Sequence, residues 1–228
     1  SGSDEILLFA ALAFCQDGDE ILHANHGFEM YSIVSKVVGA VPKKIKEDVN
    51  FNLNIENLID QTNDATKVIY IASPNNPTGT YLSRDQLVKL MNSISKNIIV
   101  VIDGAYVEYV QKDDYDKGFS LTDEYENIIL TRTFSKTYGL AALRVGWCYT
   151  SQKIADIINK IKPPFNTTTI SQSLAIKALE DKEHIENSVK LNSEIKDWFE
   201  KELKLLNIKT RQTEGNFTLI ETSEEEAD

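Results

Sequence analysis

Asp103, Lys136 and Arg144 are the residues of this sequence whose types and positions could carry out chemistry together. Asp103 follows a run of five apolar residues, Lys136 ends a Thr-Phe-Ser turn after another apolar run, and Arg144 comes soon after it. A lysine can form a Schiff base, a carboxylate can pair with a pyridinium nitrogen, and an arginine can bind a phosphate. Binding and activating pyridoxal 5'-phosphate (PLP) requires these groups, so the combination indicates a PLP site.

Each of these residues, taken alone, also has an ordinary structural explanation. Asp103 could cap a helix or belong to a buried ion pair, because an unpaired buried carboxylate is costly. Most lysines are solvated surface residues. The Asn and Pro residues of segment 74–79 are common in plain turns. What favours a cofactor site is that all three groups occur in one chain, each near the end of an apolar run.

The elements that position these residues are expected to be strands of a mainly parallel sheet. Strands are predicted by the apolar or β-branched runs 20–24, 67–73, 97–103, 127–133 and 144–150. Helical patterns lie between several of them, at 4–15, 28–38 and 84–96, and we expect Ser3 and Ser83 to cap the first and third. Alternating strands and helices indicate an α/β fold. Such sheets bind ligands beyond the carboxyl ends of their strands, where the candidate residues lie.

The sequence changes character after Pro163-Pro164. Long helical patterns cover 171–179 and 184–206, and two short strand-like runs follow at 208–211 and 216–221. We therefore expect residues 1–151 to form a PLP-binding large domain without its N-terminal part. Residues 152–228 are expected to form linking helices and an incomplete small C-terminal domain. Because the sequence opens within a helical pattern and closes on the acidic cluster 224–228, we expect a fragment with both ends missing.

Composition argues against several classes of protein. Of the 228 residues, 42% are hydrophobic and 26% are charged, which is typical of a globular protein. The formal net charge of -11 would repel a phosphate backbone, so nucleic acid is not an expected partner. Cys15 and Cys148 lack metal-ligand spacing, and no apolar run is long enough to span a membrane. We expect free thiols, no metal site, no membrane partner and a cytoplasmic location.

Three sequence blocks carry a family resemblance. Segments 73–79 (Ser-Pro-Asn-Asn-Pro-Thr-Gly), 103–106 (Asp-Gly-Ala-Tyr) and 135–147, which begins with Ser-Lys and ends with Arg-Val-Gly-Trp, resemble the signature blocks of fold-type-I PLP-dependent aminotransferases. Within that group, Phe28-Glu-Met-Tyr31 and segment 132–147 are most similar to histidinol-phosphate aminotransferases. The resemblance covers about residues 2 to 220. It implies the PLP-transferase fold type I, a mainly parallel mixed sheet flanked by helices, plus part of a smaller α/β domain.

The resemblance also implies a role for each residue around the cofactor ring. Lys136 would bind the cofactor covalently and then move the substrate Cα proton. Asp103 would pair with the pyridine nitrogen, and Asn76 and Tyr106 would hydrogen-bond the 3′-oxygen of the ring. Phe28 would stack on the ring, although a lone Phe that opens a helix more often packs in a core.

The phosphate and the substrate have their own expected contacts. Backbone N–H groups of Ser3 and Asp4, at the start of the first helix, would bind the phosphate together with the side chains of three later residues. Those three residues are Thr133, Ser135 and Arg144. Tyr31 would face either the substrate or the core, and Asn166 would line the substrate site.

The function implied is transfer of an amino group between an amino acid or amino-phosphate and 2-oxoglutarate, in a homodimer. The histidinol-phosphate reaction of L-histidine biosynthesis is the first choice. PLP-dependent C–S lyases and decarboxylases share the same blocks, and a non-catalytic aminotransferase-like binding domain is a further alternative. The family uses an arginine near its C-terminus to bind the substrate carboxylate, and Arg211 does not match that position. A tyrosine that the family supplies to the neighbouring subunit would lie before residue 1.

Overall fold

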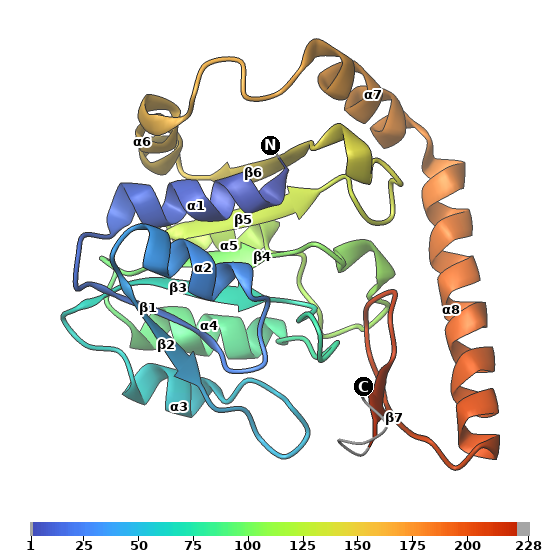
Figure 1. Cartoon of the computed structure of the whole chain (residues 1–228). Helices are drawn as coiled ribbons and strands as arrows, with labels where there is room; N and C mark the ends of the chain where they lie inside the picture. The colour runs from blue at the N-terminus through green and yellow to red at the C-terminus, as the bar shows by residue number, and fades with distance from the viewer. Residues whose placement is uncertain (1, 223–228) are drawn as a thin grey trace.

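The computed structural model describes residues 2–222, so the acidic cluster 224–228 lies outside the described residues. A six-stranded sheet is covered by helices on both faces (Figure 1). A long helix and a two-stranded ribbon lie beyond the ends of the strands, on the side toward which the arrows of β3 and β5 point. This arrangement brings C-terminal residues to the edge of the sheet where the site was predicted.

The sheet has the strand order β2-β1-β3-β4-β5-β6. Strands β1 to β5 are parallel, and β6 runs antiparallel to β5 at one edge. Their bounds are β1 Glu20–Ala24, β2 Val41–Ile45, β3 Thr66–Ala72, β4 Ile99–Asp103, β5 Ile128–Thr133 and β6 Gly146–Thr150. The prediction of a mainly parallel, mixed sheet is therefore confirmed.

Two hydrophobic cores lie on opposite faces of this sheet. One face packs against α1 (Ser3–Phe14), α2 (Met30–Val37) and α6 (Gln152–Ile161). The other packs against α3 (Ile55–Asp60), α4 (Arg84–Ser93) and α5 (Phe119–Glu124). Alternate residues of a strand face opposite sides, and in β3 Tyr70 belongs to the first core whereas Ile71 belongs to the second. Burial on both faces explains the apolar runs of the central strands.

Two helix starts were predicted, with different outcomes. In α4, Ser83 Oγ accepts a hydrogen bond from Gln86 N at 3.4 Å and Gln86 Oε1 accepts one from Ser83 N at 2.9 Å, so the capping box is confirmed. The prediction that Ser3 caps α1 was wrong. The helix already includes Ser3, and its N-cap is Gly2, which has a positive φ of 76° and makes no side-chain cap hydrogen bond. The Ser3 amide therefore belongs to the first helical turn.

Sequence patterns missed β2 and the three helices α3, α5 and α6. Strand β2 is an edge strand with mostly partly exposed or exposed residues and a proline at position 42, so it lacks the apolar run of a central strand. Helices α3 and α5 have only six residues each, too few for a clear helical period. Helix α6 buries only Ile154 and Ile158, one turn apart.

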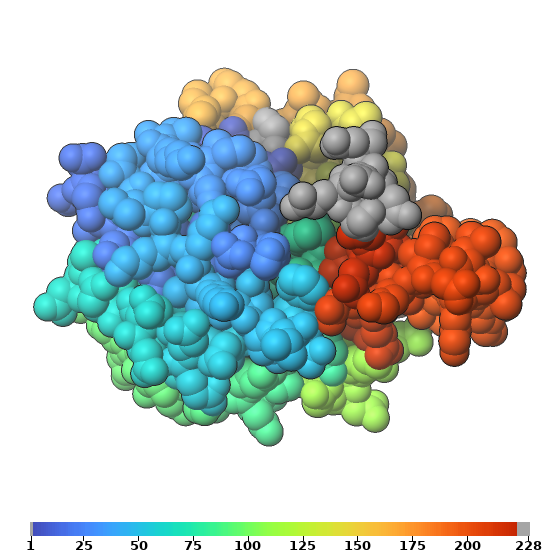
Figure 2. All heavy atoms as spheres, turned by 60° about the horizontal axis from the view of Figure 1, so that its bottom comes forward, coloured from blue at the N-terminus to red at the C-terminus, as the bar shows by residue number. Residues whose placement is uncertain are grey.

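The C-terminal part consists of α7 (Thr169–Glu180), α8 (Lys182–Leu205) and the antiparallel ribbon β7 (Lys209–Arg211) and β8 (Leu219–Glu221). Figure 2 shows the ribbon, in red, lying between α8 and the body of the molecule. The expected division into two domains after residue 151 stays a prediction. Among residues 2–222, no helix combines the length and the apolar character needed to cross a membrane.

Candidate cofactor site

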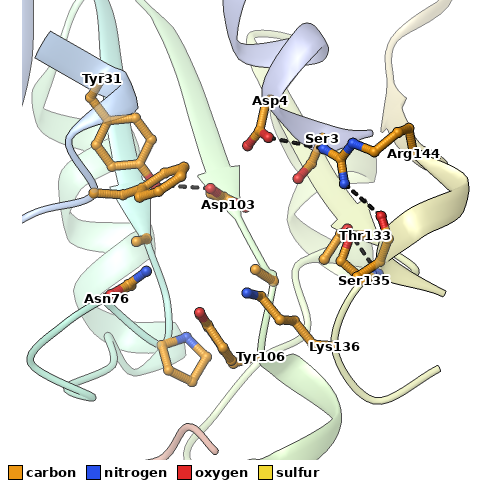
Figure 3. Close-up of a pocket in the computed structure, with 15 residues that line it drawn as sticks. Ser3, Asp4, Tyr31, Asn76, Asp103, Tyr106, Thr133, Ser135, Lys136 and Arg144 are labelled. Carbon is orange, nitrogen blue, oxygen red and sulfur yellow. Dashed lines mark hydrogen bonds and ion pairs between the residues drawn. The ribbon is translucent and has the colours of Figure 1, made fainter. Parts of the chain in front are cut away.

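A cavity of about 220 Å³ lies beyond the carboxyl ends of the central strands. It is lined by eleven of the twelve residues singled out in the sequence (Figure 3). These are Ser3, Asp4, Phe28, Tyr31, Asn76, Asp103, Tyr106, Thr133, Ser135, Lys136 and Arg144. The exception is Asn166, whose Nδ2 donates to Glu5 Oε2 at 2.8 Å. The structure thus gathers residues from the starts of α1 and α2, from the segments that follow β1, β3, β4 and β5, and from the segment just before β6.

Lys136 and Tyr106 lie next to each other in the cavity (Figure 3), and Lys136 Nζ lies 5.3 Å from the centre of the Tyr106 ring. Within residues 2–222, the side chains of Lys136, Tyr106 and Asn76 form no hydrogen bond with another residue. The loop before Lys136 is ordered by Thr133 and Ser135, because Ser135 N donates to Thr133 Oγ1 at 3.1 Å. Three polar groups are therefore available to a ligand.

Asp103 is the buried charge of the site, with 5% of its surface exposed. Its Oδ2 accepts a hydrogen bond from Tyr31 Oη at 3.0 Å, and its Oδ1 accepts one from Thr131 Oγ1 at 2.9 Å. Burial raises the pKa of Asp103, and these two hydroxyl donors oppose that rise. Among the described residues Asp103 has no cationic partner within ion-pair distance, so a cation in the cavity would stabilise the carboxylate.

Tyr31 belongs to the wall of the cavity. Of the two expected placements, facing the substrate or the core, the structure shows the second for most of the side chain, which is 1% exposed. Its ring stacks on Tyr70 with centres 4.9 Å apart and meets the edge of Phe28 at 5.8 Å. Burial, and then the charge of Asp103, raise the pKa of Tyr31 well above its ordinary value. Tyr31 is therefore a permanent hydrogen-bond donor to Asp103.

The opposite end of the cavity is built for an anion. Helix α1 begins there at Ser3, so the unpaired N–H groups of its first turn face the cavity. Arg144 Nη2 lies 3.2 Å from Asp4 Oδ2, and Arg144 Nη1 donates to Ala141 O at 2.9 Å. Gly146 allows this close approach, because a Cβ there would lie 2.7 Å from Ser3 N. Backbone donors and a guanidinium thus converge as a phosphate requires.

The loop that carries Asn76 is held by its neighbour Asn75. Asn75 Nδ2 donates to His26 O at 2.8 Å and to Thr78 Oγ1 at 2.8 Å, and Asn75 N donates to Thr80 O at 2.7 Å. The Ser73–Pro74 and Asn76–Pro77 peptide bonds are both cis. The hydrogen bonds by which Asn75 holds this loop were not predicted from the sequence.

Arg132 is a second residue that sequence reasoning missed. It is 4% exposed and its guanidinium lies beside the stacked rings of Phe119 and Trp147, 5.7 and 5.9 Å from their centres. Arg132 donates to Thr131 O at 2.7 Å and also to Lys117 O. The available signal was an arginine inside a strand that the sequence predicts to be buried. Arg211 lies elsewhere, with its guanidinium 4.8 Å from the centre of the Phe51 ring.

The residues of the cavity fit PLP. A buried carboxylate without a bound cation suits a protonated pyridine nitrogen, an unbonded lysine amine suits an aldehyde, and a helix start with an arginine suits a phosphate. Asn76 and Tyr106 supply two further unbonded polar groups. In the described part of the chain, no cluster of three His, Cys, Asp or Glu residues could hold a metal ion.

Comparison with known proteins gives the same assignment. The model of the family described as aminotransferase class I and II matches residues 1–228. The histidinol-phosphate aminotransferase of Zymomonas mobilis is 40% identical over 223 residues, which are 96% of this chain and 60% of that protein. The enzyme of the same name from Pelagibacter ubique is 41% identical over 220 residues, 96% of this chain and 61% of that protein.

Solved structures share the fold. The chain superimposes on the aspartate aminotransferase of Thermotoga maritima with a TM-score of 0.86 at 26% identity, over 94% of this chain and 58% of that one. It superimposes on the histidinol-phosphate aminotransferase of Sinorhizobium meliloti in complex with pyridoxal-5'-phosphate with a TM-score of 0.91. At 22% identity over 96% of this chain and 59% of that one, the second likeness shows the fold alone.

These comparisons confirm the predicted fold and family. The chain spans about 60% of the length of the curated relatives it matches. It belongs to the class I and II aminotransferases.

Proposed function

We propose that this chain binds PLP and forms the larger part of an aminotransferase that moves an amino group between an amino acid or amino-phosphate and 2-oxoglutarate. The observation that carries the proposal is that Lys136, Asp103 and Arg144 line one cavity. The relatives at about 40% identity, which are named histidinol-phosphate aminotransferases, support histidinol phosphate as the first donor to test.

The proposal gives each polar end of the cavity a part of the cofactor. Asp103 would pair with the ring nitrogen, and Arg144 with the first-turn amides of α1 would bind the phosphate. Thr133 and Ser135 would add hydroxyl donors to the phosphate. Phe28, at the cavity wall beside Tyr31, would cover one face of the ring.

When bound, PLP supplies an electron-accepting ring that stabilises negative charge on the substrate Cα. Lys136 Nζ would hold the cofactor covalently and, once the substrate amine displaces it, can take the Cα proton and return it. Asp103 would keep the ring nitrogen protonated, because the buried carboxylate gains most from a cationic partner. Asn76 and Tyr106 would donate hydrogen bonds to the 3′-oxygen and orient the ring.

Three further features belong to the proposal. A cytoplasmic location is supported by two cysteines, Cys15 and Cys148, that are free and partly buried. The family typically forms homodimers. It also typically has a large and a small domain, which in this chain would be residues 1–151 and the start of a small domain in residues 152–228. Asn166 would act on the substrate only if it left its contact with Glu5.

The cofactor assignment is tested by adding PLP to the purified chain and recording the absorbance near ~420 nm, where a lysine-bound PLP absorbs. Borohydride reduction and mass spectrometry should then find the phosphopyridoxyl mass on the peptide that carries Lys136. The Lys136→Ala protein should carry no label, whereas Lys160→Ala, a change on an exposed part of α6, should be labelled normally. A label spread over several lysines would contradict the assignment.

The reaction is tested with histidinol phosphate and 2-oxoglutarate, followed by the appearance of glutamate. Glutamate formation that depends on both compounds and on Lys136 supports the proposal. Release of sulfide from cysteine, or of carbon dioxide from an amino acid, would assign the site to a lyase or decarboxylase of the same fold. Labelled protein without any turnover would favour a binding domain.

A further inference from the structure

The turn between β7 and β8, residues 213–217, packs against the wall of the cofactor cavity. Phe217 meets Tyr106 edge to face, with ring centres 5.2 Å apart and an interplanar angle of 81°. Tyr106 is 5% exposed and lines the cavity. The ribbon that carries this turn lies between α8 and the body of the molecule (Figure 2). A segment late in the sequence thus supports a residue of the site.

The same turn docks on the loop that carries Asn76. Glu214 N donates to Gly79 O at 2.8 Å, and Gly79 N donates to Asn75 O at 2.7 Å. Thr213 is fully buried, and a Cβ on Gly79 would occupy the space that Thr213 fills. Because Gly79 also has a positive φ of 71°, glycine suits this position twice over. The turn therefore contacts the supports of both residues proposed to bind the 3′-oxygen.

Helix α8 holds this turn through polar side chains. Three of its residues, His184, Asn192 and Lys196, make hydrogen bonds to backbone carbonyl groups outside the helix. Lys196 donates to Thr213 O, and Asn192 Nδ2 donates to Gly215 O at 3.4 Å. His184 Nε2 lies 3.0 Å from Thr137 O, next to Lys136. The helix thus connects the turn and the Lys136 loop.

We propose that Phe217 is a positioning residue that sets the direction of the Tyr106 ring. Within residues 2–222 the Tyr106 side chain forms no hydrogen bond, so packing alone orients its hydroxyl. The Phe217 ring packs against the Tyr106 ring in an edge-to-face contact, and Lys136 Nζ lies over the Tyr106 ring. The functional meaning of this role rests on the proposed function, in which Tyr106 donates to the 3′-oxygen of PLP.

The closing experiment uses Phe217→Ala, with Phe217→Tyr as the conservative variant and Phe165→Ala as the control. Phe165 is 96% exposed and lies outside the cavity. We expect Phe217→Ala to weaken PLP binding about tenfold, the upper range for loss of an aromatic pair. The pH midpoint of the bound-cofactor absorbance should rise, because a misplaced Tyr106 stabilises the 3′-oxygen anion less. Phe217→Tyr should restore both values.

A second measurement needs no cofactor. The protein is labelled with 3-fluorotyrosine, and the Tyr106 resonance is assigned by its loss in Tyr106→Phe. In the unliganded protein, Phe217→Ala should shift or broaden that resonance, whereas Phe165→Ala should leave it in place. An unchanged resonance, or an unchanged PLP affinity together with an unchanged pH midpoint, would overturn the proposal. Wild-type protein that binds no PLP would instead defeat the proposed function, and the resonance would still decide the role of Phe217.

Discussion

Tyr31 Oη donates a 3.0 Å hydrogen bond to Asp103 Oδ2 inside the protein. Both residues are buried, and Tyr31 is fixed from the other side by its stack on Tyr70. A hydrogen bond to a buried charged group contributes about 1.5 to 3 kcal/mol. The protonation of Asp103, and with it the affinity for a ring cation, therefore depends on a residue outside the segments that supply the charged groups.

We expect Tyr31→Phe to weaken PLP binding by about tenfold or more, and more strongly as the pH falls. Loss of the hydroxyl donor raises the pKa of Asp103 further, so the carboxylate is protonated at a higher pH. Tyr70→Phe is the matched control, because Tyr70 is equally buried but donates to Leu7 O at 2.7 Å. Equal pH profiles of PLP affinity in the two variants would contradict this account.

Asp103→Asn should have opposite effects on the unliganded and the liganded protein. Burial raises the pKa of Asp103 above its ordinary value of 3.8, so its contribution to folding is complete below that value and is lost as the pH rises through the raised pKa. Asn cannot ionise. In urea unfolding at about pH 4 and about pH 8, the variant should gain stability relative to wild type at the higher pH.

With PLP present, the wild-type protein should instead be more stable than the variant, because Asn gives the pyridinium nitrogen no counter-charge. The variant should bind PLP more weakly and show less stabilisation by added cofactor. A difference in unfolding free energy that stays constant between the two pH values would show that Asp103 is not desolvated in the unliganded fold.

Asp4→Asn tests how the phosphate is bound. Asp4 and Arg144 are paired at 3.2 Å and both side chains are about half exposed. If the phosphate contacts main-chain N–H groups of α1 and Arg144, removing the negative charge of Asp4 should tighten PLP binding by roughly threefold at low salt. High salt should cancel the gain. Weaker binding of Asp4→Asn would mean that the Asp4 carboxylate itself orients Arg144 for the ligand.

Arg132 offers a test of buried charge near the site. Burial raises the pKa of Glu108, and the charge of Arg132 opposes that rise. Arg132→Met should raise the pKa of Glu108 further, so the loss of stability should grow as the pH rises through the pKa of Glu108. Adding Glu108→Gln should remove the extra pH dependence. Urea unfolding of both variants at several pH values measures the free energy of unfolding. If Arg132→Met alone loses the same stability at every pH, Arg132 is not coupled to Glu108.

The sequence allowed the central strands and the charged residues at their ends to be predicted. Long β-branched runs identify buried parallel strands, and the parallel arrangement places their carboxyl ends at one edge. Asp103 and Lys136 follow such runs, so their meeting could be foreseen. The short helices α3 and α5 and the edge strand β2 could not be predicted, because they bury too few residues to show a periodic apolar pattern.

Contacts between distant segments were beyond sequence patterns. The donation from Tyr31 to Asp103 depends on how α2 packs across the sheet, and the contact of Phe217 with Tyr106 depends on where the ribbon returns. Ser3 was predicted as a cap because serine favours that position, yet Gly2 takes it. The start of α1 is therefore set by the close packing of Gly2 against Arg144 and Gly146, and not by the preference of serine for the cap position.

The antiparallel direction of β6 has a consequence for biosynthesis. It brings Arg144, two residues before β6 begins, beside Asp4 in α1. During translation the anion-binding end of the cavity cannot be complete until β6 has left the ribosome and joined the sheet. Shorter nascent chains lack the guanidinium of Arg144. Cofactor capture therefore has to follow the closing of the sheet.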